Sequence, residues 1–507
     1  MSVGVSRGDI LAVCNFRLIG YDKCANANGN VAIRPGTFYF PFPSLSSPMV
    51  RPTLVRILLG AAAAVAVANT ARAATYYVSN QGNDQNEGRS PQAAWASLAR
   101  VSRASLQPGD KVLFHRGHVW RGQLVPQSGD ETSRITYAAY AEGEKPLLLG
   151  SISKSKPEDW TDEGNSIWSA GGLPIDVGNI IFGNEETCGV KKWRRSDLRQ
   201  DNDYWYDRVT HKVKLRSAVN PARRYARIEC AMDRHGIDES GRHYVTYEGL
   251  AVKYAAAHGI GGGATHHITV RNCDIGFIGG GALRRYKETT PERYGNGIEF
   301  WSKAHDNLVE GCRLWEIFDA ALTNQSHPLI KGGRGPGTPQ YNLTYRNNVI
   351  WNAEYSWEYW NRPENSETHD VYFVHNTCIN AGHGWGHSQR PDPSGRQLCF
   401  YSSPARARNI VIRDNIFCEA KANAFCAPSW SRAQIEALVM DHNCWYQAKG
   451  KMILFKDASY AMADFAKYQA DWHKEPHSIC ALPKFMDAEH HDFRLAPGSR
   501  CAGMGSQ

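Results

Sequence analysis

Two glutamates stand in short segments whose residue pattern turns them away from a protein core. The segments are residues 297–301 (GIEFW) and 356–360 (SWEYW), with Glu299 and Glu358 at their centres. Apolar residues flank each glutamate at period 2, which predicts a strand with a buried apolar face and an outward carboxylate. A pair of carboxylates can supply the general acid and the general base that cleave a glycosidic bond with water.

A repeat that recurs down the second half of the chain sets the distance between these segments. Its copies lie from 28 to 39 residues apart, and their internal alternation of period 2 indicates strands of a stacked solenoid. One column of small, mostly polar residues is expected to stack at a tight turn, where asparagines can hydrogen-bond between coils. The copies read ITVRNCDI (268–275), VEGCRL (309–314), LTYRNNVI (343–350), YFVHNTCI (372–379), IVIRDNIF (410–417) and LVMDHNCW (438–445). The column consists of Cys273, Cys312, Asn348, Thr377, Asn415 and Asn443.

Motifs at both ends complete a recognisable pattern. The first block reads TYYVS (75–79), GNDQNEG (82–88) and PGDKVLF (108–114), and the last reads DFRLAPGS (492–499). With the repeats between them, these blocks resemble secreted right-handed parallel β-helix proteins of the pectate-lyase-like superfamily. The resemblance covers most of residues 74–507 and implies an all-β, right-handed parallel β-helix. It leaves the reaction open, because this superfamily holds lyases, hydrolases, esterases and binding proteins.

The domain organisation begins with two removable segments. Residues 49–73 carry a basic start, an apolar stretch and the small-x-small end Ala71-Arg-Ala73, which predicts a secretory signal peptide that is too short to span a membrane. Residues 1–48 are then expected to be a mis-called extension. Residues 74–150 should form the N-terminal cap and first coils, 151–235 an inserted β-rich lobe, and 236–507 the main coils and C-terminal cap.

Charge and cysteine usage narrow the function classes. Without residues 1–73 the chain keeps 51 basic and 48 acidic residues, a net charge of about +3, so a nucleic-acid partner is not expected. The cysteines lack metal-ligand spacing, so no metal and no cofactor are expected, apart from Ca²⁺ if the protein is a lyase. We expect a secreted or periplasmic monomer without a membrane span, whose partner is a polysaccharide.

The resemblance also implies where a site would lie. Active sites of this superfamily sit on the outer face of the first sheet, whose strands are expected here at 297–301, 320–325, 356–360, 384–388 and 424–427. Glu299 and Glu358 then share an outward column two coils apart. At about 4.8 Å per coil the backbones lie roughly 10 Å apart, so the carboxylates can reach the window of roughly 6.5–9.5 Å used by inverting glycosidases. Asp319, at a corner between them, can raise a neighbour's pKa.

Aromatic and basic residues crowd the same sheet and its loops. An outward glutamate on a solvated sheet is ordinary by itself, but a solvated face usually carries Lys, Thr and Ser instead of these side chains. The expected catalytic residues are Glu299, Glu358, Asp319, His387 and Arg390. The expected substrate-binding residues are Tyr286, Trp301, Trp360, Arg362, His383 and Lys331.

Three functions follow from these residues. The first is a carbohydrate-active enzyme that hydrolyses a polysaccharide, with one glutamate as acid and the other as base. The second is a polysaccharide lyase acting on a uronic-acid-containing glycan, where His387, Arg390, Lys331 or Arg362 could serve as the base or could neutralise the uronic carboxylate. The third is a non-catalytic glycan-binding β-helix.

Overall fold

The computed structural model of the chain describes residues 73–283, 292–326, 337–362, 364–401, 403 and 405–506. The predicted extension at 1–48 and nearly all of the predicted signal peptide at 49–73 lie outside these residues. Among the helices of the described part, none is long and apolar enough to cross a membrane.

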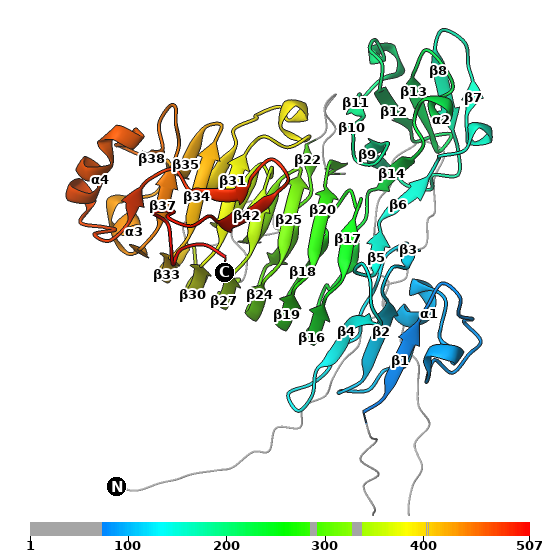
Figure 1. Ribbon diagram of the computed structural model, residues 1–507, viewed down its shortest axis with the longest axis horizontal. Coiled ribbons are helices and arrows are strands. Elements are labelled where there is room, and N and C mark those ends of the chain that lie inside the picture. Colours follow the sequence, from blue (N-terminus) through cyan, green and yellow to red (C-terminus); the bar gives the residue numbers. More distant parts are fainter. Residues whose placement is uncertain are drawn as a thin grey trace, which may run out of the picture. The chain divides into compact units, whose positions relative to one another are not determined.

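Three long sheets, made almost entirely of parallel strands, wind into a right-handed β-helix, as the resemblance implied (Figure 1). From β15 onward the chain visits the first, second and third sheets in turn. The first sheet contains β15 (Ile237–Asp238), β18 (Ile260–Gly263), β23 (Ile298–Trp301), β26 (Ala320–Ser326), β29 (Tyr355–Asn361), β32 (Arg396–Phe400), β35 (Asn423–Ala427), β38 (Ile453–Phe455) and the antiparallel β39 (Ser459–Tyr460).

The second and third sheets have ten strands each. The second contains β1 (Thr75–Val78), β2 (Lys111–His115), β4 (Ile135–Tyr140), β16 (His243–Glu248), β19 (His266–Arg271), β24 (His305–Glu310), β27 (Gln340–Arg346), β30 (Glu367–Val374), β33 (Arg406–Arg413) and β36 (Val439–Asp441). The third contains β3 (Val119–Arg121), β5 (Leu147–Leu149), β17 (Ala251–Lys253), β20 (Asp274–Ile278), β25 (Arg313–Ile317), β28 (Val349–Trp351), β31 (Thr377–Ala381), β34 (Ile416–Ala420), β37 (Cys444–Tyr446) and β40 (Ile479–Cys480).

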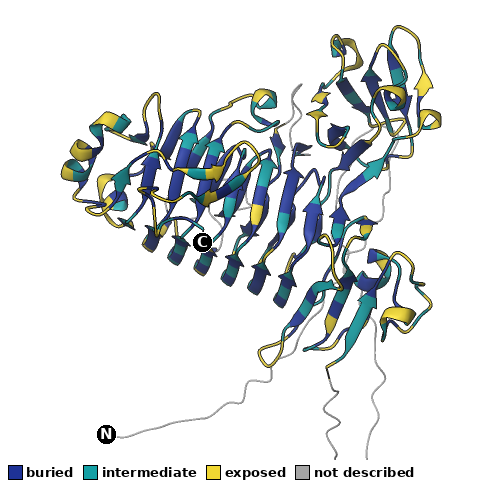
Figure 2. Ribbon diagram, in the orientation of Figure 1, coloured by how far each residue is buried: buried dark blue, intermediate teal, exposed yellow. Residues whose placement is uncertain are grey.

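The core fills the inside of the coils, where alternate residues of all three sheets meet. Figure 2 shows that the strands of the stack consist largely of buried residues. In the first sheet, Ile298, Leu322 and Trp357 occupy one inward row and are fully buried. Trp357 stacks on Phe373 of the second sheet, with ring centroids 5.0 Å apart and planes 3° apart. The apolar members of the period-2 pattern therefore bind the sheets to each other.

An inserted lobe interrupts the coils between β5 and β15, confirming the β-rich insertion expected near 151–235. It has two small sheets, mostly antiparallel, and a hydrophobic cluster of its own. One sheet contains β6 (Ser151–Ser153), β14 (Ile228–Met232), β9 (Val177–Phe182) and β10 (Thr187–Cys188). The other contains β7 (Thr161–Asp162), β8 (Ile167–Ala170), β13 (Lys212–Arg216), β12 (Asp203–Asp207) and β11 (Val190–Lys191).

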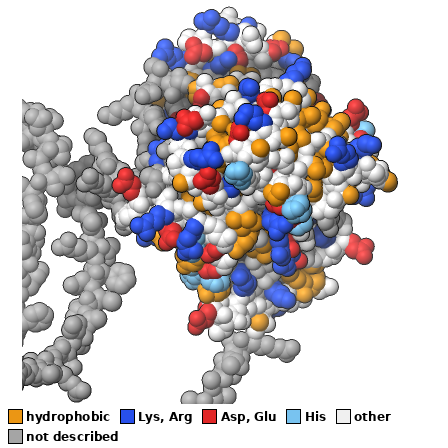
Figure 3. All heavy atoms as spheres, turned by 90° about the vertical axis from the view of Figure 1, so that its left-hand side faces the viewer, with side chains coloured by type: hydrophobic (Ala, Val, Ile, Leu, Met, Phe, Trp, Pro, Cys, Tyr) orange, Lys and Arg blue, Asp and Glu red, His pale blue; other side chains and the backbone are white. Residues whose placement is uncertain are grey.

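Short elements complete the described chain. They are α1 (Leu98–Ser102), α2 (Pro221–Arg224), α3 (Arg432–Glu436), α4 (Phe465–Trp472) and the hairpins β21 (Gly281–Ala282) with β22 (Arg293–Tyr294) and β41 (Phe485–Asp487) with β42 (Asp492–Leu495). Figure 3 views the end of the strand stack that carries α3 and α4, where acidic and basic side chains are interspersed. This mixed surface agrees with the small net charge of the chain after residue 73.

A ladder of buried asparagines lies at the corner between the second and third sheets. It consists of Asn348, Asn376, Asn415 and Asn443. At each step the side-chain oxygen of one asparagine accepts the backbone N–H of the preceding one, at 2.8 to 3.1 Å. Each side-chain NH₂ donates to a strand carbonyl, as Asn376 does to Tyr345 at 3.0 Å. The ladder gives hydrogen-bond partners to buried backbone groups that would otherwise have none.

The expected place of Thr377 in this column is wrong by one residue. Thr377 begins β31, and Asn376 occupies the ladder. Three consecutive apolar residues, 372–374, hide the alternation in this coil, and the sequence alone does not say which of them faces inward. Phe373 faces inward because it stacks on Trp357, which moves the turn one residue toward the N-terminus.

We predict that Asn376→Ala lowers the free energy of unfolding by about 2 kcal/mol. The substitution removes the hydrogen bonds that Asn376 makes to the buried backbone N–H of Asn348 and to the carbonyl of Tyr345. Urea unfolding followed by fluorescence measures the change. The matched control is Arg346→Ala, which removes a partly exposed ion pair with Glu310 and should change stability by about 0.5 kcal/mol or less. Equal losses in the two variants would show that the ladder is not a stabilising element.

Candidate active site

Glu299 and Glu358 leave the first sheet from one outward row. Glu299 pairs in register with Thr323 on β26, and Thr323 pairs with Glu358 on β29. The two glutamates are therefore two strands apart, which separates their backbones by about 10 Å. Both side chains are nonetheless buried, with residue exposures of 7% and 6%. The two carboxyl groups are therefore withdrawn from solvent, although they leave the outward face of the sheet.

Glu299 is held by two nitrogen donors. The side-chain NH₂ of Asn296 donates to Oε2 at 2.7 Å, and Nε2 of His258 lies 3.1 Å from Oε1. Nδ1 of His258 accepts the backbone N–H of Asn296 at 2.9 Å, so the ring proton sits on Nε2 and points at Glu299. Burial lowers the pKa of His258 to about 3, which keeps the ring neutral. Burial raises the pKa of Glu299 to about 7, against the lowering effect of the Asn296 hydrogen bond.

Glu358 has a different environment. Its Oε2 accepts one hydrogen bond from Nε2 of Gln325 at 3.0 Å, and Oε1 of Gln325 accepts the indole N–H of Trp360. Burial raises the pKa of Glu358 well above its usual value, and the negative charge of Asp319 raises it further. The guanidinium of Arg390 works in the opposite direction. The net effect favours the protonated form of this carboxyl.

Asp319 lies beside this row and is paired with Arg390. Nη1 of Arg390 donates to Oδ1 of Asp319 and to the carbonyl of Phe318, both at 3.0 Å. Burial raises the pKa of Asp319, whereas the neighbouring Arg390 lowers it. The guanidinium also packs over the rings of Phe318 and Tyr355, at 5.3 and 5.5 Å. Arg390 is therefore held at Nη1 and by its ring contacts, while its buried Nε makes no hydrogen bond to the described residues.

Glu354 links Arg390 to His387. Its Oε2 lies 2.9 Å from Nδ1 of His387, and its Oε1 lies 3.9 Å from Nε of Arg390. Oε1 also accepts the backbone N–H groups of Ser394 and Gly395, at 2.7 and 2.9 Å. A buried carboxylate thus gathers both ends of the segment from His387 to Gly395. His387 and Arg390 position this segment next to the outward row that contains Glu299, Thr323 and Glu358, called the acid row below.

The same segment corrects an expected strand. Residues 384–388 lie in a turn that ends in a short 3₁₀ helix at His387–Gln389, and the strand of this coil is β32, whose Cys399 pairs with Glu358. The segment 390–397 therefore lies mainly before a strand, not after one. The glycines serve close packing instead of a strand: a Cβ on Gly384 would come within 2.1 Å of the carbonyl oxygen of Asn352.

The remaining expected residues divide into three groups. Trp301 and Trp360 flank Gln325 in the next outward row and are both partly exposed, and the exposed Arg362 stacks on Trp360 at 4.1 Å. His383 is exposed at the start of the segment that contains His387. Its electrostatic neighbours are Lys421, Glu419 and His387. Tyr286 and Lys331 lie outside the described residues.

Four polar residues of this site were missed from the sequence: His258, Asn296, Gln325 and Glu354. Gln325 lies in a predicted strand two residues after Thr323, so strict alternation would have placed it outward. Asn296 stands three residues before Glu299, at the mouth of the same strand. His258 and Glu354 carry no signal of their own, because they reach the site only through the stacking of coils.

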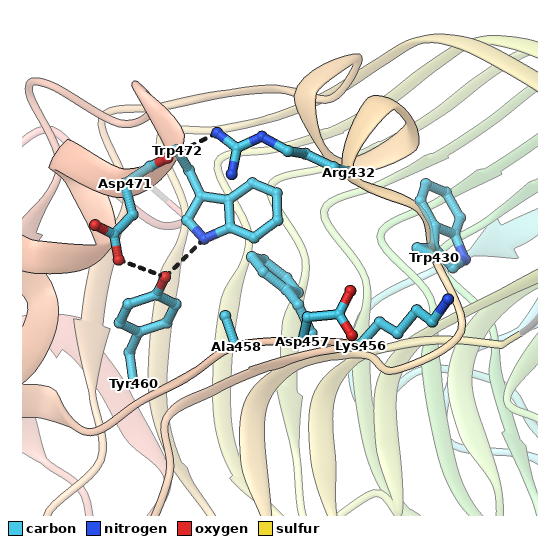
Figure 4. A pocket seen from close by; sticks show the side chains of 9 residues that line it. Trp430, Arg432, Lys456, Asp457, Ala458, Tyr460, Asp471 and Trp472 are labelled. Atoms are coloured by element: carbon cyan, nitrogen blue, oxygen red, sulfur yellow. Dashed lines mark hydrogen bonds between the residues drawn. The ribbon is translucent and has the colours of Figure 1, made fainter.

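Two cavities lie apart from the acid row. One of about 250 Å³ is lined by Trp430, Arg432, Phe455, Lys456, Asp457, Ala458, Tyr460, Asp471 and Trp472 (Figure 4). It lies near β38, five strands from β23, which is about 24 Å. Its polar groups bond to each other: the Trp472 indole donates to the Tyr460 hydroxyl, which donates to Asp471 (Figure 4). These contacts are structural.

The second cavity, of about 300 Å³, lies where the lobe meets the segment that carries His387. It is lined by Glu185, Glu186, Thr187, Cys188, Val190, Phe277, Glu316, Trp385, Ser388 and Gln389. Gln389 bonds to the lobe through the carbonyl of Gly189 at 2.9 Å and the N–H of Lys191 at 3.2 Å. Its side-chain oxygen also accepts from the buried Arg293 at 2.9 Å. The segment beside the acid row is thereby tied to the lobe.

Comparison with known proteins finds no matching family model. The chain is similar to a lacto-N-biosidase of Bifidobacterium longum subsp. longum, with 36% identity over 100 residues. That match covers 18% of this chain and 6% of the relative, so the chain spans a small fraction of the curated protein that it matches.

Solved structures with a similar course of the chain include hydrolases and a lyase. A structure titled glycoside hydrolase aligns with TM-score 0.47 and 11% identity over 76% of this chain and 95% of its own. The GH136 lacto-N-biosidase from Eubacterium ramulus aligns with TM-score 0.30 and 13% identity over 80% and 68%. An alginate lyase from a Paenibacillus species aligns with TM-score 0.36 and 11% identity over 72% and 95%.

Proposed function

We propose that this protein is a glycoside hydrolase that cleaves a polysaccharide by inversion, with Glu358 as general acid and Glu299 as general base. The observation that carries the proposal is the row itself: two buried, outward glutamates stand two strands apart in different hydrogen-bond environments. A backbone separation of about 10 Å allows the carboxyl groups to meet the window of roughly 6.5–9.5 Å that holds one sugar ring and one water.

The two environments assign the two roles. Burial and the neighbouring charge of Asp319 raise the pKa of Glu358 and so favour its protonated form, which can give a proton to the glycosidic oxygen as the bond to the anomeric carbon breaks. Glu299 accepts from Asn296 and His258, and both bonds favour its ionised form. It can take a proton from water as the water oxygen attacks the anomeric carbon. One water is consumed, and exchange with solvent restores both carboxyls.

Two of the groups that elimination could use are already paired within the protein. A lyase needs a cation to neutralise the uronic carboxylate; Arg390 is paired with Asp319 and His387 with Glu354, which leaves the exposed Arg362 as the candidate cation among the described residues. Trp301 and Trp360, in the adjacent outward row, offer the apolar surfaces on which sugar rings stack. Arg362, stacked on Trp360, remains as a group that can contact an acidic or hydroxyl-rich substrate.

We further propose that the enzyme is exported and that residues 49–73 are removed as a signal peptide, on the basis of their basic, apolar and small-x-small succession. Expression in a bacterial host with an export pathway should yield a mature chain that begins at Ala74. Intact mass measurement of the exported protein checks this. An exported chain that keeps residues 49–73 would contradict it.

We predict that Glu299→Gln and Glu358→Gln each lower kcat by about 10²–10⁴-fold while glycan binding persists. Acidic and neutral polysaccharides are screened for new reducing ends and, in the same samples, for the ultraviolet absorbance of unsaturated sugars. Glu367→Gln, the same substitution at a partly exposed glutamate on β30 of the second sheet, is the matched control and should keep full activity. Unsaturated products would establish a lyase, and glycan binding without any turnover of the wild type would establish a binding protein.

The pH dependence follows from the two carboxyls. Because Glu299 must be ionised and burial raises its pKa to about 7, kcat/KM should fall tenfold per pH unit below that value. The alkaline limb should report Glu358, whose proton is needed for catalysis. Asp319→Asn removes a negative charge that raises the pKa of Glu358, so this limb should move to lower pH. An alkaline limb unmoved by that substitution would refute the assigned acid.

A further inference from the structure

A second cluster of chemically active side chains lies at the corner between the first and second sheets. In each coil this corner holds one residue in the left-handed conformation, with φ between 50° and 55°. The residues before the first five of them form a stack of rings with centroids 4.7 to 5.1 Å apart. The left-handed column is Tyr244, His267, Asp306, Asn342, Asp370 and Asn409. The ring stack is His243, His266, His305, Tyr341 and His369.

Three of these residues converge from two neighbouring coils. Nδ1 of His305 lies 2.7 Å from Oδ2 of Asp306, and Nε2 of His267, one coil earlier, lies 4.0 Å from the same oxygen. One donor atom from each of the three residues lies within 4.8 Å of the others. Their side chains are 26 to 33% exposed, so solvent reaches them although neighbouring rings restrict their motion.

The neighbours leave the converging atoms correctly oriented. Oδ1 of Asp306 accepts a hydrogen bond from the side-chain NH₂ of Asn342, which turns Oδ2 toward the two imidazoles. His267 stacks on Tyr244 with centroids 4.3 Å apart, which fixes the plane of its ring. Arg134 donates to the backbone carbonyl of His267 and adds positive charge nearby. Asp306 supplies the negative charge that offsets it.

We propose that His267, His305 and Asp306 bind a divalent transition-metal ion, with Zn²⁺ as the best match. Two imidazoles and one carboxylate are a ligand set that Zn²⁺ takes, and water can complete the tetrahedron. Ligand atoms around a tetrahedral Zn²⁺ lie about 3.3 Å apart, so the 2.7 Å contact must open and the 4.0 Å contact must close, each by less than 1 Å. Rotation of the Asp306 carboxylate, which moves its Oδ2 away from His305 and toward His267, supplies such shifts while the imidazoles stay stacked.

The chain contains its own control for this site. Two coils farther on, His369 and Asp370 repeat the pair, with Nδ1 and Oδ2 again 2.7 Å apart. Asn409 holds the other oxygen of Asp370, as Asn342 holds that of Asp306. The position that corresponds to His267 is Asn342, whose amide replaces the second imidazole. A metal site and a simple His–Asp contact therefore make different predictions for the two corners.

The test is calorimetric titration of the full chain, prepared without a polyhistidine tag, with ZnSO₄. We expect saturable binding that His267→Asn and Asp306→Asn each weaken by at least about tenfold, since each removes one of three ligands. Asparagine already occupies the left-handed positions 342 and 409, so both variants preserve the backbone conformation. Asp370→Asn should bind Zn²⁺ like the wild type. Thermal unfolding without metal verifies that each variant is folded.

Several results would overturn the site. Absence of binding by the wild type is one, and unchanged binding by either His267→Asn or Asp306→Asn is another. Equal losses in Asp306→Asn and Asp370→Asn would show a general effect of the corner. A loss confined to Asp441→Asn would place the ion at a different group, Asp441 with His442 and His477, where Arg413 lies 3.3 Å from the His442 ring nitrogen.

Discussion

Parallel strand pairing at a fixed spacing of about 4.8 Å is the constraint on which this molecule depends. It forces residues that are tens of positions apart in the sequence into shared rows and columns. Inward rows become the core, as with Ile298, Leu322 and Trp357, and corner columns become ladders, as with the asparagines. Outward rows bring functional groups together. The register of the first sheet therefore determines the candidate site as firmly as it determines the fold.

Burial gives the acid row its chemistry. Glu299, Asp319 and Glu358 are all withdrawn from water, and this raises the pKa of each carboxyl. Their differences come from their partners: two N–H donors at Glu299, a guanidinium at Asp319 and one amide at Glu358. The three carboxyl groups therefore differ in the hydrogen bonds and charges that surround them. Arg390 prevents the cluster from becoming one uncompensated set of buried charges.

The sequence was sufficient wherever alternation was unambiguous. Period-2 patterns and the repeat length predict stacked strands, and a break in the repeat marks the lobe. The resemblance to the pectate-lyase-like superfamily implies the right-handed β-helix and the first sheet on which Glu299 and Glu358 share a row. The sequence was insufficient where apolar residues run together, as at 372–374, or where glycines imitate a short strand, as at 384–388. It was also silent about His258 and Glu354. Their partners come from other coils, and no local spacing records how two coils of unequal length stack.

Because coils stack at a fixed spacing, the distance between two side chains in one row changes only in steps of one coil, about 4.8 Å. One coil, the one that contributes β26, separates Glu299 from Glu358. If that coil were excised as a unit, the two glutamates would stand on adjacent strands, about 4.8 Å apart at the backbone, near the separation of roughly 5 Å that retaining glycosidases use. In a hydrolase built in this way, the number of coils between the two glutamates would decide whether the reaction inverts or retains the configuration of the sugar. Gain or loss of a single repeat would then be a route between the two mechanisms.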